Sequence, residues 1–268
     1  MLRDITLGQY YPTDSVIHRM DPRTKLVGTL VFIFSLFLFR SFSAYAVATL
    51  ALAAVIRVSK VPFKFMVKGL KAIMILLMIT VVFNLFLTPG TPALTIWKLT
   101  ITWEGIRQAV FMAIRLAFLI IGSSIMTLTT TPNNLTDGLE KGLGPLKKLH
   151  VPVHEVAMMM SIALRFIPIL LEETDKIMKA QMARGADFES GGLIKKAKSL
   201  VPLLVPLFIS AFRRANDLAM AMEARGYRGG EGRTKMKPLV YKRRDKAAYL
   251  LMLVYLGCMF AVNYFVPV

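Results

Sequence analysis

The chain has 268 residues, of which 55% are hydrophobic, and a formal net charge of +18. This apolar share exceeds that of an ordinary soluble domain and favours a protein that has lipid as its solvent. The single cysteine, Cys258, excludes a disulfide framework and a cysteine-based zinc site. The excess of Lys and Arg has three explanations: nucleic-acid binding, attraction to anionic lipid headgroups, or retention of basic loops in the cytoplasm.

The first apolar run, residues 26–39, must be distinguished from a cleaved signal peptide, because residues 44–46 read Ala-Tyr-Ala, a small-x-small triplet. About 25 residues precede this run, among them three aspartates, whereas a signal peptide begins with a short basic region. We therefore interpret the run as the first membrane span.

Five apolar stretches are candidates for transmembrane helices: residues 26–39, 42–56, 70–87, 109–128 and 247–262. The first has only 14 residues, about 21 Å of helix against a hydrocarbon core of roughly 30 Å. It must borrow flanking residues, tilt, or thin the bilayer. The sequence predicts an all-α polytopic membrane protein with about five transmembrane helices.

The basic residues predict the orientation of these spans. If they alternate from a cytoplasmic N-terminus, the inside segments 1–25, 57–71 and 129–246 hold 4, 5 and 21 Lys and Arg residues, 30 of the 34 in the chain. This distribution is the positive-inside bias expected of a multi-pass protein in the cell membrane. We expect transmembrane helices 1–4 in residues 1–128, a cytoplasmic domain in 129–246, and a last transmembrane helix in 247–268.

Two features lie toward the predicted outside. Residues 88–105 contain the turn-forming pair Pro89-Gly90 and the tryptophans Trp97 and Trp103, which suit a membrane interface, so we expect an outer surface or re-entrant loop. Arg115 falls inside the fourth apolar stretch, where an arginine faces the helix bundle or extends to a headgroup.

The cytoplasmic segment contains two long helical patterns. Residues 153–183 carry an apolar face at helical spacing, with Pro168 expected to kink the helix. Residues 193–224 form a second pattern, which Pro202 and Pro206 should bend or break near its start. These would be the long helices of the cytoplasmic module.

Both patterns end in the same triplet, followed by a polar loop that contains glycine. The six residues are Ala183, Arg184, Gly185, Ala224, Arg225 and Gly226. One copy would be explained as a helix end, because Gly favours the left-handed conformation there and Arg complements the helix dipole. Two copies, 41 residues apart, favour a function. A planar guanidinium with five donors suits an acidic or carbonyl-lined groove in a partner, and two such ends imply two grooves.

With these motifs the chain resembles the transmembrane coupling subunit of energy-coupling factor transporters, bacterial ABC-type importers of vitamins and transition metals. The N-terminal segment His18-Arg19-Met20-Asp21-Pro22-Arg23-Thr24-Lys25 is also similar to that family. The resemblance implies that the two Ala-Arg-Gly ends dock into two ABC-type ATPase subunits. It also implies that the coupling helices carry an exchangeable membrane subunit that binds the substrate, so that substrate specificity resides outside this chain.

Seven methionines lie on or near the two helices: Met158, Met159, Met160, Met178, Met182, Met220 and Met222. Their unbranched, polarizable side chains can repack against different partners, which suits contacts with a substrate-binding subunit. Ordinary filling of a protein core is the alternative explanation.

Several other functions lack their motifs. No phosphate-binding loop of the Gly-x-x-x-x-Gly-Lys type occurs, so we expect no nucleotide site. His150 and His154 are separated by Pro152 and have no third ligand at helical spacing, so we expect no metal site, and no cofactor is expected. A membrane-embedded enzyme acting on a lipid or isoprenoid is an alternative, but only Asn84 offers a suitable side chain within a span. Residues 129–246 carry a net charge of +9 with acids interspersed, which argues against a nucleic-acid surface.

Overall fold

The computed structural model describes residues 10–39, 41–96, 99–188, 192, 194, 198–229 and 235–265. The chain divides into two compact units. We call residues Gly8–Gly138 with Leu239–Val268 the bundle unit, and residues Leu139–Pro238 the hairpin unit. Each is described by itself below.

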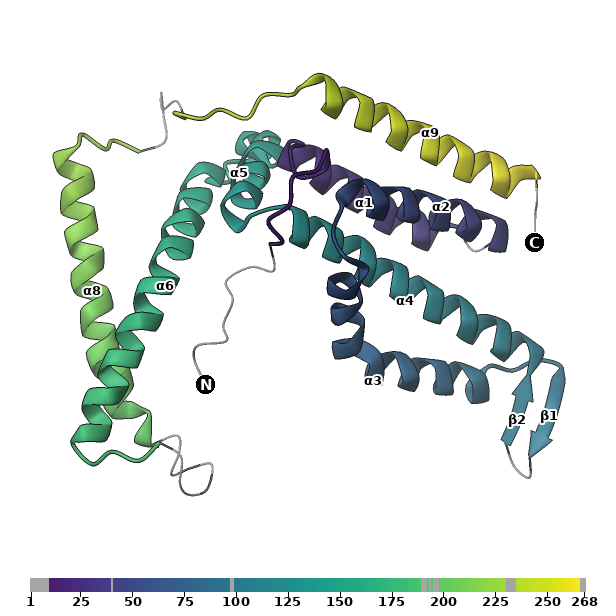
Figure 1. Ribbon diagram of the computed structural model, residues 1–268, viewed down its shortest axis with the longest axis horizontal. Helices are drawn as coiled ribbons and strands as arrows, with labels where there is room; N and C mark the ends of the chain where they lie inside the picture. Colours follow the sequence, from purple (N-terminus) through teal and green to yellow (C-terminus); the bar gives the residue numbers. More distant parts are fainter. Residues whose placement is uncertain are drawn as a thin grey trace. The chain divides into compact units, whose positions relative to one another are not determined.

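Five long helices form the bundle unit: α1 (Pro22–Leu38), α2 (Phe42–Ser59), α3 (Phe63–Leu87), α4 (Trp103–Thr129) and α9 (Arg243–Phe265) (Figure 1). Helix α5 (Pro132–Gly142) begins in this unit. The predicted outer loop contains an antiparallel hairpin of strands β1 (Pro92–Ile96) and β2 (Leu99–Thr102), a detail that the turn residues did not indicate. Trp97 of this loop lies outside the described residues, and Trp103 begins α4 with an exposed side chain.

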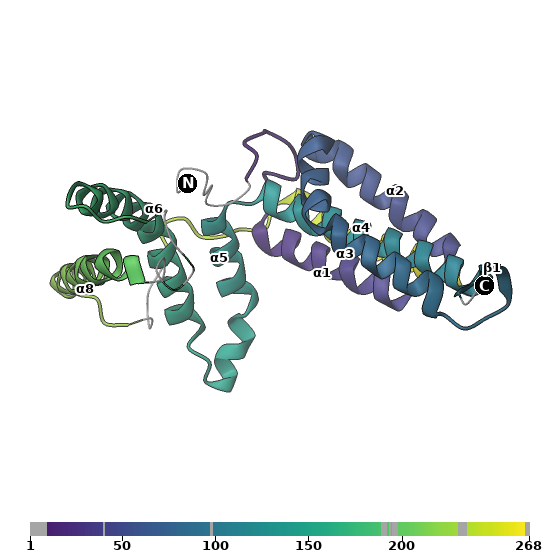
Figure 2. The same ribbon diagram turned by 90° about the horizontal axis from the view of Figure 1, so that it is seen from below.

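Helix α4 is the centre of the bundle unit. It contacts α1, α2 and α3, and Figure 2 shows these four helices from a second side. Helix α9 contacts α1 and α2. One apolar cluster joins α2, α3 and α4 through residues such as Leu52, Met66 and Ile125, and another joins α1 and α2 through Leu36 and Tyr45. Many large aliphatic side chains point away from these clusters, for example Ile75 and Leu50, which are 76% and 72% exposed. Such a surface is suited to lipid rather than to water.

Helix length and hydropathy support the membrane assignment. Among the described residues, α2, α4, α9 and Val153–Ala183 are long and apolar enough to span a bilayer, and α3 is a further candidate if its two parts, bent by 62°, form one span. Helix α1, which contains the predicted first span, has 17 residues, about 26 Å, and is not among the described helices that meet these criteria. The segment Val153–Ala183 meets the criteria of length and composition although its position in the chain and its flanking charges led us to predict a cytoplasmic helix.

The hairpin unit is built from α6 (Val153–Ala183) and α8 (Val201–Ala224), preceded by the short 3₁₀ helix η2 (Gly144–Leu149). The predicted helix 153–183 is confirmed with Pro168 inside it, and the second helix begins at Val201 with Pro202 in its first turn and Pro206 inside it. The prediction for residues 193 and 195–197 falls outside the described residues. The two helices run in opposite directions, because Gln181 donates to the carbonyl of Pro202 while Arg214 pairs with Glu173 (Figure 1). The predicted all-α class is confirmed, with the small β-hairpin as an addition.

Candidate functional site

We call residues 183–185 the first tip and residues 224–226 the second tip. The first tip closes α6 with two backbone hydrogen bonds. Gly185 donates to the carbonyl of Met182 at 3.0 Å, and Ala186 donates to the carbonyl of Gln181 at 2.9 Å. This pair of bonds is a Schellman motif, in which the residue after the helix cap adopts a left-handed backbone. Gly185 has φ of +87°. The glycine of the first triplet is therefore required by the helix end itself.

The second tip repeats this geometry bond for bond. Gly226 donates to the carbonyl of Glu223 at 2.8 Å, and Tyr227 donates to the carbonyl of Met222 at 3.0 Å, while Gly226 has φ of +72°. The cap residues Arg184 and Arg225 have nearly equal dihedral angles, with φ of −88° and −91°. The sequence repeat is thus a repeat of local structure.

The cap geometry explains the glycines but leaves the arginines unexplained. Arg184 and Arg225 are exposed, and neither guanidinium makes a hydrogen bond or ion pair with any residue that the structure describes. Any residue with ordinary backbone preferences could occupy the cap position, whereas an arginine presents five N–H donors there. The two side chains are free to bind a partner.

The two tips lie at opposite ends of α8. Gln181, near the end of α6, contacts Pro202 at the start of α8, whereas Arg225 follows the last residue of α8. A helix of 24 residues is about 36 Å long, so the two tips are separated by roughly that distance. They cannot enter one groove together.

The seven methionines differ in exposure. Met159, Met160, Met182 and Met220 are exposed, while Met158, Met178 and Met222 are partly buried. A different apolar stripe is more continuous and was missed from the sequence: α8 exposes Val201, Leu204, Val205, Phe208, Ile209 and Phe212. Its spacing of three and four residues is a signal that we did not use.

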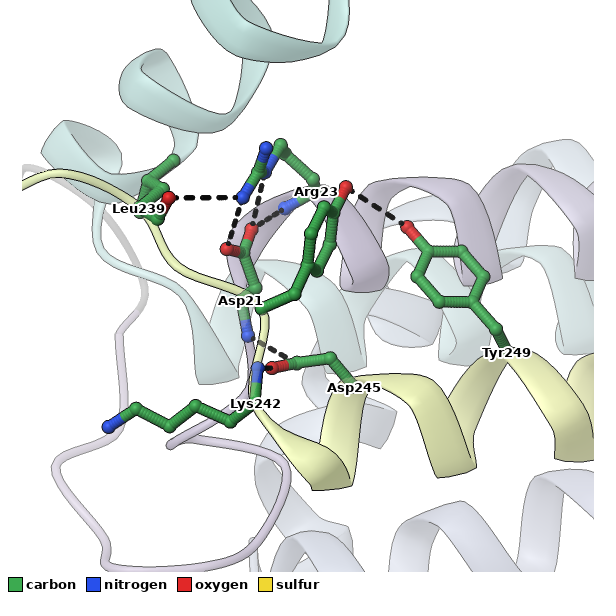
Figure 3. Close-up of polar contacts among 7 residues, drawn as sticks. Asp21, Arg23, Leu239, Lys242, Asp245 and Tyr249 are labelled. Atoms are coloured by element: carbon green, nitrogen blue, oxygen red, sulfur yellow. Dashed lines mark hydrogen bonds and ion pairs between the residues drawn. The ribbon is translucent and has the colours of Figure 1, made fainter.

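A buried polar junction joins the start of α1 to the chain entering α9 (Figure 3). Asp21 accepts hydrogen bonds from the backbone and side chain of Arg23, and the Arg23 guanidinium donates to the carbonyl of Leu239 at 3.3 Å. The same guanidinium lies 3.9 Å from the ring centroid of Tyr241. Burial opposes ionisation of Asp21, but the bonds from Arg23 prevail and lower the pKa of Asp21. The contact between Arg23 and Leu239 joins residues 216 positions apart, which the sequence does not indicate.

Two further predictions concern single side chains. The Arg115 guanidinium faces the bundle and donates to the hydroxyl of Tyr45 at 2.8 Å, one of the two placements we expected.

His154 pairs with Glu140 at 2.8 Å, and Lys235 contacts the same carboxylate at 2.6 Å. No group of three metal-ligating side chains occurs among the described residues.

Among the described residues, four helices, or five if the bent helix α3 is counted, are long and apolar enough to span a bilayer. This number of spans defines a multi-pass membrane protein. A family profile described as CbiQ, cobalt transport protein, matches residues 13–236. Among curated proteins, the energy-coupling factor transporter transmembrane protein EcfT of Clostridium kluyveri is 59% identical over 256 residues, covering 95% of each chain. The EcfT proteins of Ruminiclostridium cellulolyticum and Bacillus subtilis are 51% and 47% identical, over 98% and 97% of this chain and 99% and 98% of their own.

The chain therefore belongs to the family of transmembrane components of bacterial energy-coupling factor transporters. This membership confirms the resemblance stated above and makes the protein a non-catalytic transporter subunit. The alternative of a membrane-embedded enzyme acting on a lipid or isoprenoid is set aside on the same ground.

Proposed function

We propose that the hairpin unit docks into two cytoplasmic ABC-type ATPase subunits through Arg184 and Arg225. The observation that carries the proposal is the pair of matching helix ends, each presenting an exposed arginine without a partner among the described residues. A guanidinium at a helix end suits a groove lined by carboxylates or carbonyls. Two equal ends suit two similar grooves.

The separation of the tips supports two partners rather than one. Because α8 holds the tips roughly 36 Å apart, each tip meets its own subunit. Rigid helices between the tips would then convert a change in the distance between the two ATPases into a movement of α6 relative to α8. The ion pair between Arg214 and Glu173, 3.1 Å long, lies across these helices and resists their separation.

The second partner in the proposal is an integral membrane subunit that binds the substrate and is exchangeable. The exposed apolar residues of α8, together with Met159, Met160, Met182 and Met220, supply a surface that such a subunit could contact. In this arrangement ATP binding and hydrolysis move the hairpin unit, and this movement reorients the binding subunit for uptake of a vitamin or other micronutrient. The N-terminus and residues 129–246 are cytoplasmic, as the distribution of Lys and Arg indicates.

The test is purification of the transporter in mild detergent, with the ATPases per chain counted and substrate uptake measured after reconstitution. Arg184→Ala and Arg225→Ala should each weaken ATPase binding by about 2–5 kcal/mol, the usual result of truncating one partner of a buried interfacial charge pair. The double variant should lose the ATPases and uptake but remain in the membrane. Arg213→Ala, an exposed arginine in the middle of α8, is the matched control. Wild-type ATPase content in the double variant would refute the docking role.

A further inference from the structure

A second group of arginines lies in the bundle unit, at the end where α2 and α4 begin and α9 finishes. A cavity of about 580 Å³ is lined there by Ser41, Glu104, Arg107, Gln108, Phe111, Met112, Arg115 and Asn263. Its polar atoms come from three helices, and Phe111 and Met112 supply an apolar wall. The cavity is not enclosed, so its lining residues are accessible from outside the bundle.

The two arginines of this cavity lack anionic partners in the described part of the chain. Arg115 uses its Nε to donate to the hydroxyl of Tyr45, and its other N–H groups remain for a ligand. The guanidinium of Arg107 lies 5.6 Å from the ring centroid of Phe42 and makes no ion pair with a described residue. The carboxylate of Glu104 also lines the cavity, but it accepts hydrogen bonds from the backbone and hydroxyl of Thr91. The site therefore has an excess of positive charge.

The start of α2 adds to this positive field. Ser41 precedes the first turn of α2, yet its hydroxyl donates to Asn263 Oδ1 at 3.3 Å instead of capping the helix. The backbone N–H groups of the first turn are thus left without a side-chain acceptor, and the positive end of the helix dipole lies beside the two guanidinium groups. Helix starts and guanidinium groups both bind phosphate oxygens.

The surroundings of the cavity place it at the level of lipid headgroups. Trp103 at the start of α4 and Tyr264 and Phe265 at the end of α9 are 66%, 80% and 79% exposed. Such aromatic residues gather where a membrane helix meets the interface. Arg115 lies eight residues further along α4 than Arg107, about 12 Å deeper, and lines the same cavity.

We propose that this cavity binds the phosphodiester of an anionic phospholipid headgroup. The guanidinium groups of Arg107 and Arg115 hold the phosphate oxygens as charge-assisted donors, Gln108 and Asn263 contact the polar glycerol, and the acyl chains leave over Phe111 and Met112. Lipid binding at this face of the bundle unit does not depend on the docking of the ATPases.

The experiment titrates phosphatidylglycerol into the detergent-purified transporter and follows bound lipid by native mass spectrometry. Arg107→Gln and Arg115→Gln should each weaken binding about tenfold, the usual loss for one hydrogen bond to a charged group. Arg57→Gln, an exposed arginine at the other end of α2, is the control and should bind normally. Arg107 is exposed and, among the described residues, its guanidinium contacts only the rings of Phe42 and Phe111, so Arg107→Gln should disturb the fold less than Arg115→Gln, which removes the hydrogen bond to Tyr45.

Competition distinguishes the sources of phosphate. Phosphatidylcholine should bind more weakly than phosphatidylglycerol, because its choline charge opposes the arginines, and millimolar inorganic phosphate should not displace the lipid. Displacement by inorganic phosphate would overturn the lipid assignment in favour of a soluble anion. Equal lipid binding by the wild-type protein and the double variant would overturn the site.

Discussion

The carboxylate of Asp245 accepts a 2.8 Å hydrogen bond from the backbone N–H of Asp21, 224 residues earlier in the chain. Its other oxygen accepts from the backbone N–H of Lys242 at 2.8 Å, ahead of the first turn of α9 (Figure 3). One carboxylate, 1% exposed, thus closes the start of α9 and joins it to the start of α1. Both helix starts belong to the bundle unit, so this junction joins its first and last helices.

Asp245→Asn should destabilise the bundle unit. An amide has only one acceptor oxygen, so one of the two backbone N–H groups loses its partner, at a cost of about 1–3 kcal/mol. Asp245→Ala removes both acceptors and should cost more. Thermal unfolding in detergent measures the effect, with the exposed Asp217→Asn as control. If Asp245→Ala melts at the wild-type temperature, the junction contributes nothing to stability.

Burial of Lys25 should make the free energy of unfolding depend on pH. Its side chain, 8% exposed and ahead of the apolar run of α1, donates to the carbonyls of Thr129 and His18. Burial lowers the pKa of Lys25 from 10.5 to about 8, although Asp245 and Asp21 oppose the shift. Below pH 8 the lysine is protonated in both states and the folded state bears the cost of burying the charge. Between the two pKa values the unfolded chain binds more protons, so stability should rise with pH.

The rise amounts to a free energy on the order of 3 kcal/mol over the full interval. Melting temperatures of the wild type and of Lys25→Met, compared at pH 7.5 and pH 9.5, isolate this contribution, because the variant has no group to titrate. Lys64→Met, which removes an exposed lysine, should keep the wild-type pH response. The same response in Lys25→Met and wild type would show that Lys25 is not the source.

The two parts of each tip should respond differently to substitution. Gly185→Ala and Gly226→Ala force a side chain into the left-handed region and should cost about 1–2 kcal/mol of helix-end stability, while Gly→Asn at the same positions should cost less. Arg184→Ala and Arg225→Ala should leave stability unchanged and affect only binding. Hydrogen exchange of the last turns of α6 and α8 measures the first effect. Fraying in the arginine variants equal to that in the glycine variants would mean that the arginines serve the cap.

Gly138 in α5 should not tolerate a larger residue. A Cβ atom there would lie 2.8 Å from Cβ of Pro22, the first residue of α1, and 3.3 Å from its carbonyl carbon. Gly138→Ala should therefore shift α5 or α1 and cost about 1–3 kcal/mol. Gly142→Ala, in the same helix with open space around the position, should be neutral or slightly stabilising. Equal melting of the two variants would contradict the close contact.

The sequence alone determined the all-α class, the ends of α6 and α8, and the two tip motifs. Each depends on neighbours along the chain: apolar runs long enough for a bilayer, helical spacing from Val153 to Ala183, and glycines that end helices. The predicted docking role of Arg184 and Arg225 came from the same local pattern together with the family resemblance, and it stays a proposal.

Only the tertiary structure decided which distant residues meet. Nothing local in the sequence pairs Asp245 with Asp21, places Arg107 and Arg115 in one cavity with Asn263, or sets the tips at opposite ends of α8. These relationships depend on how helices pack across long separations in sequence, and apolar periodicity gives the face of a helix but not its neighbour. The physical reason is that packing of whole surfaces, rather than any single segment, selects the partner of each buried polar group.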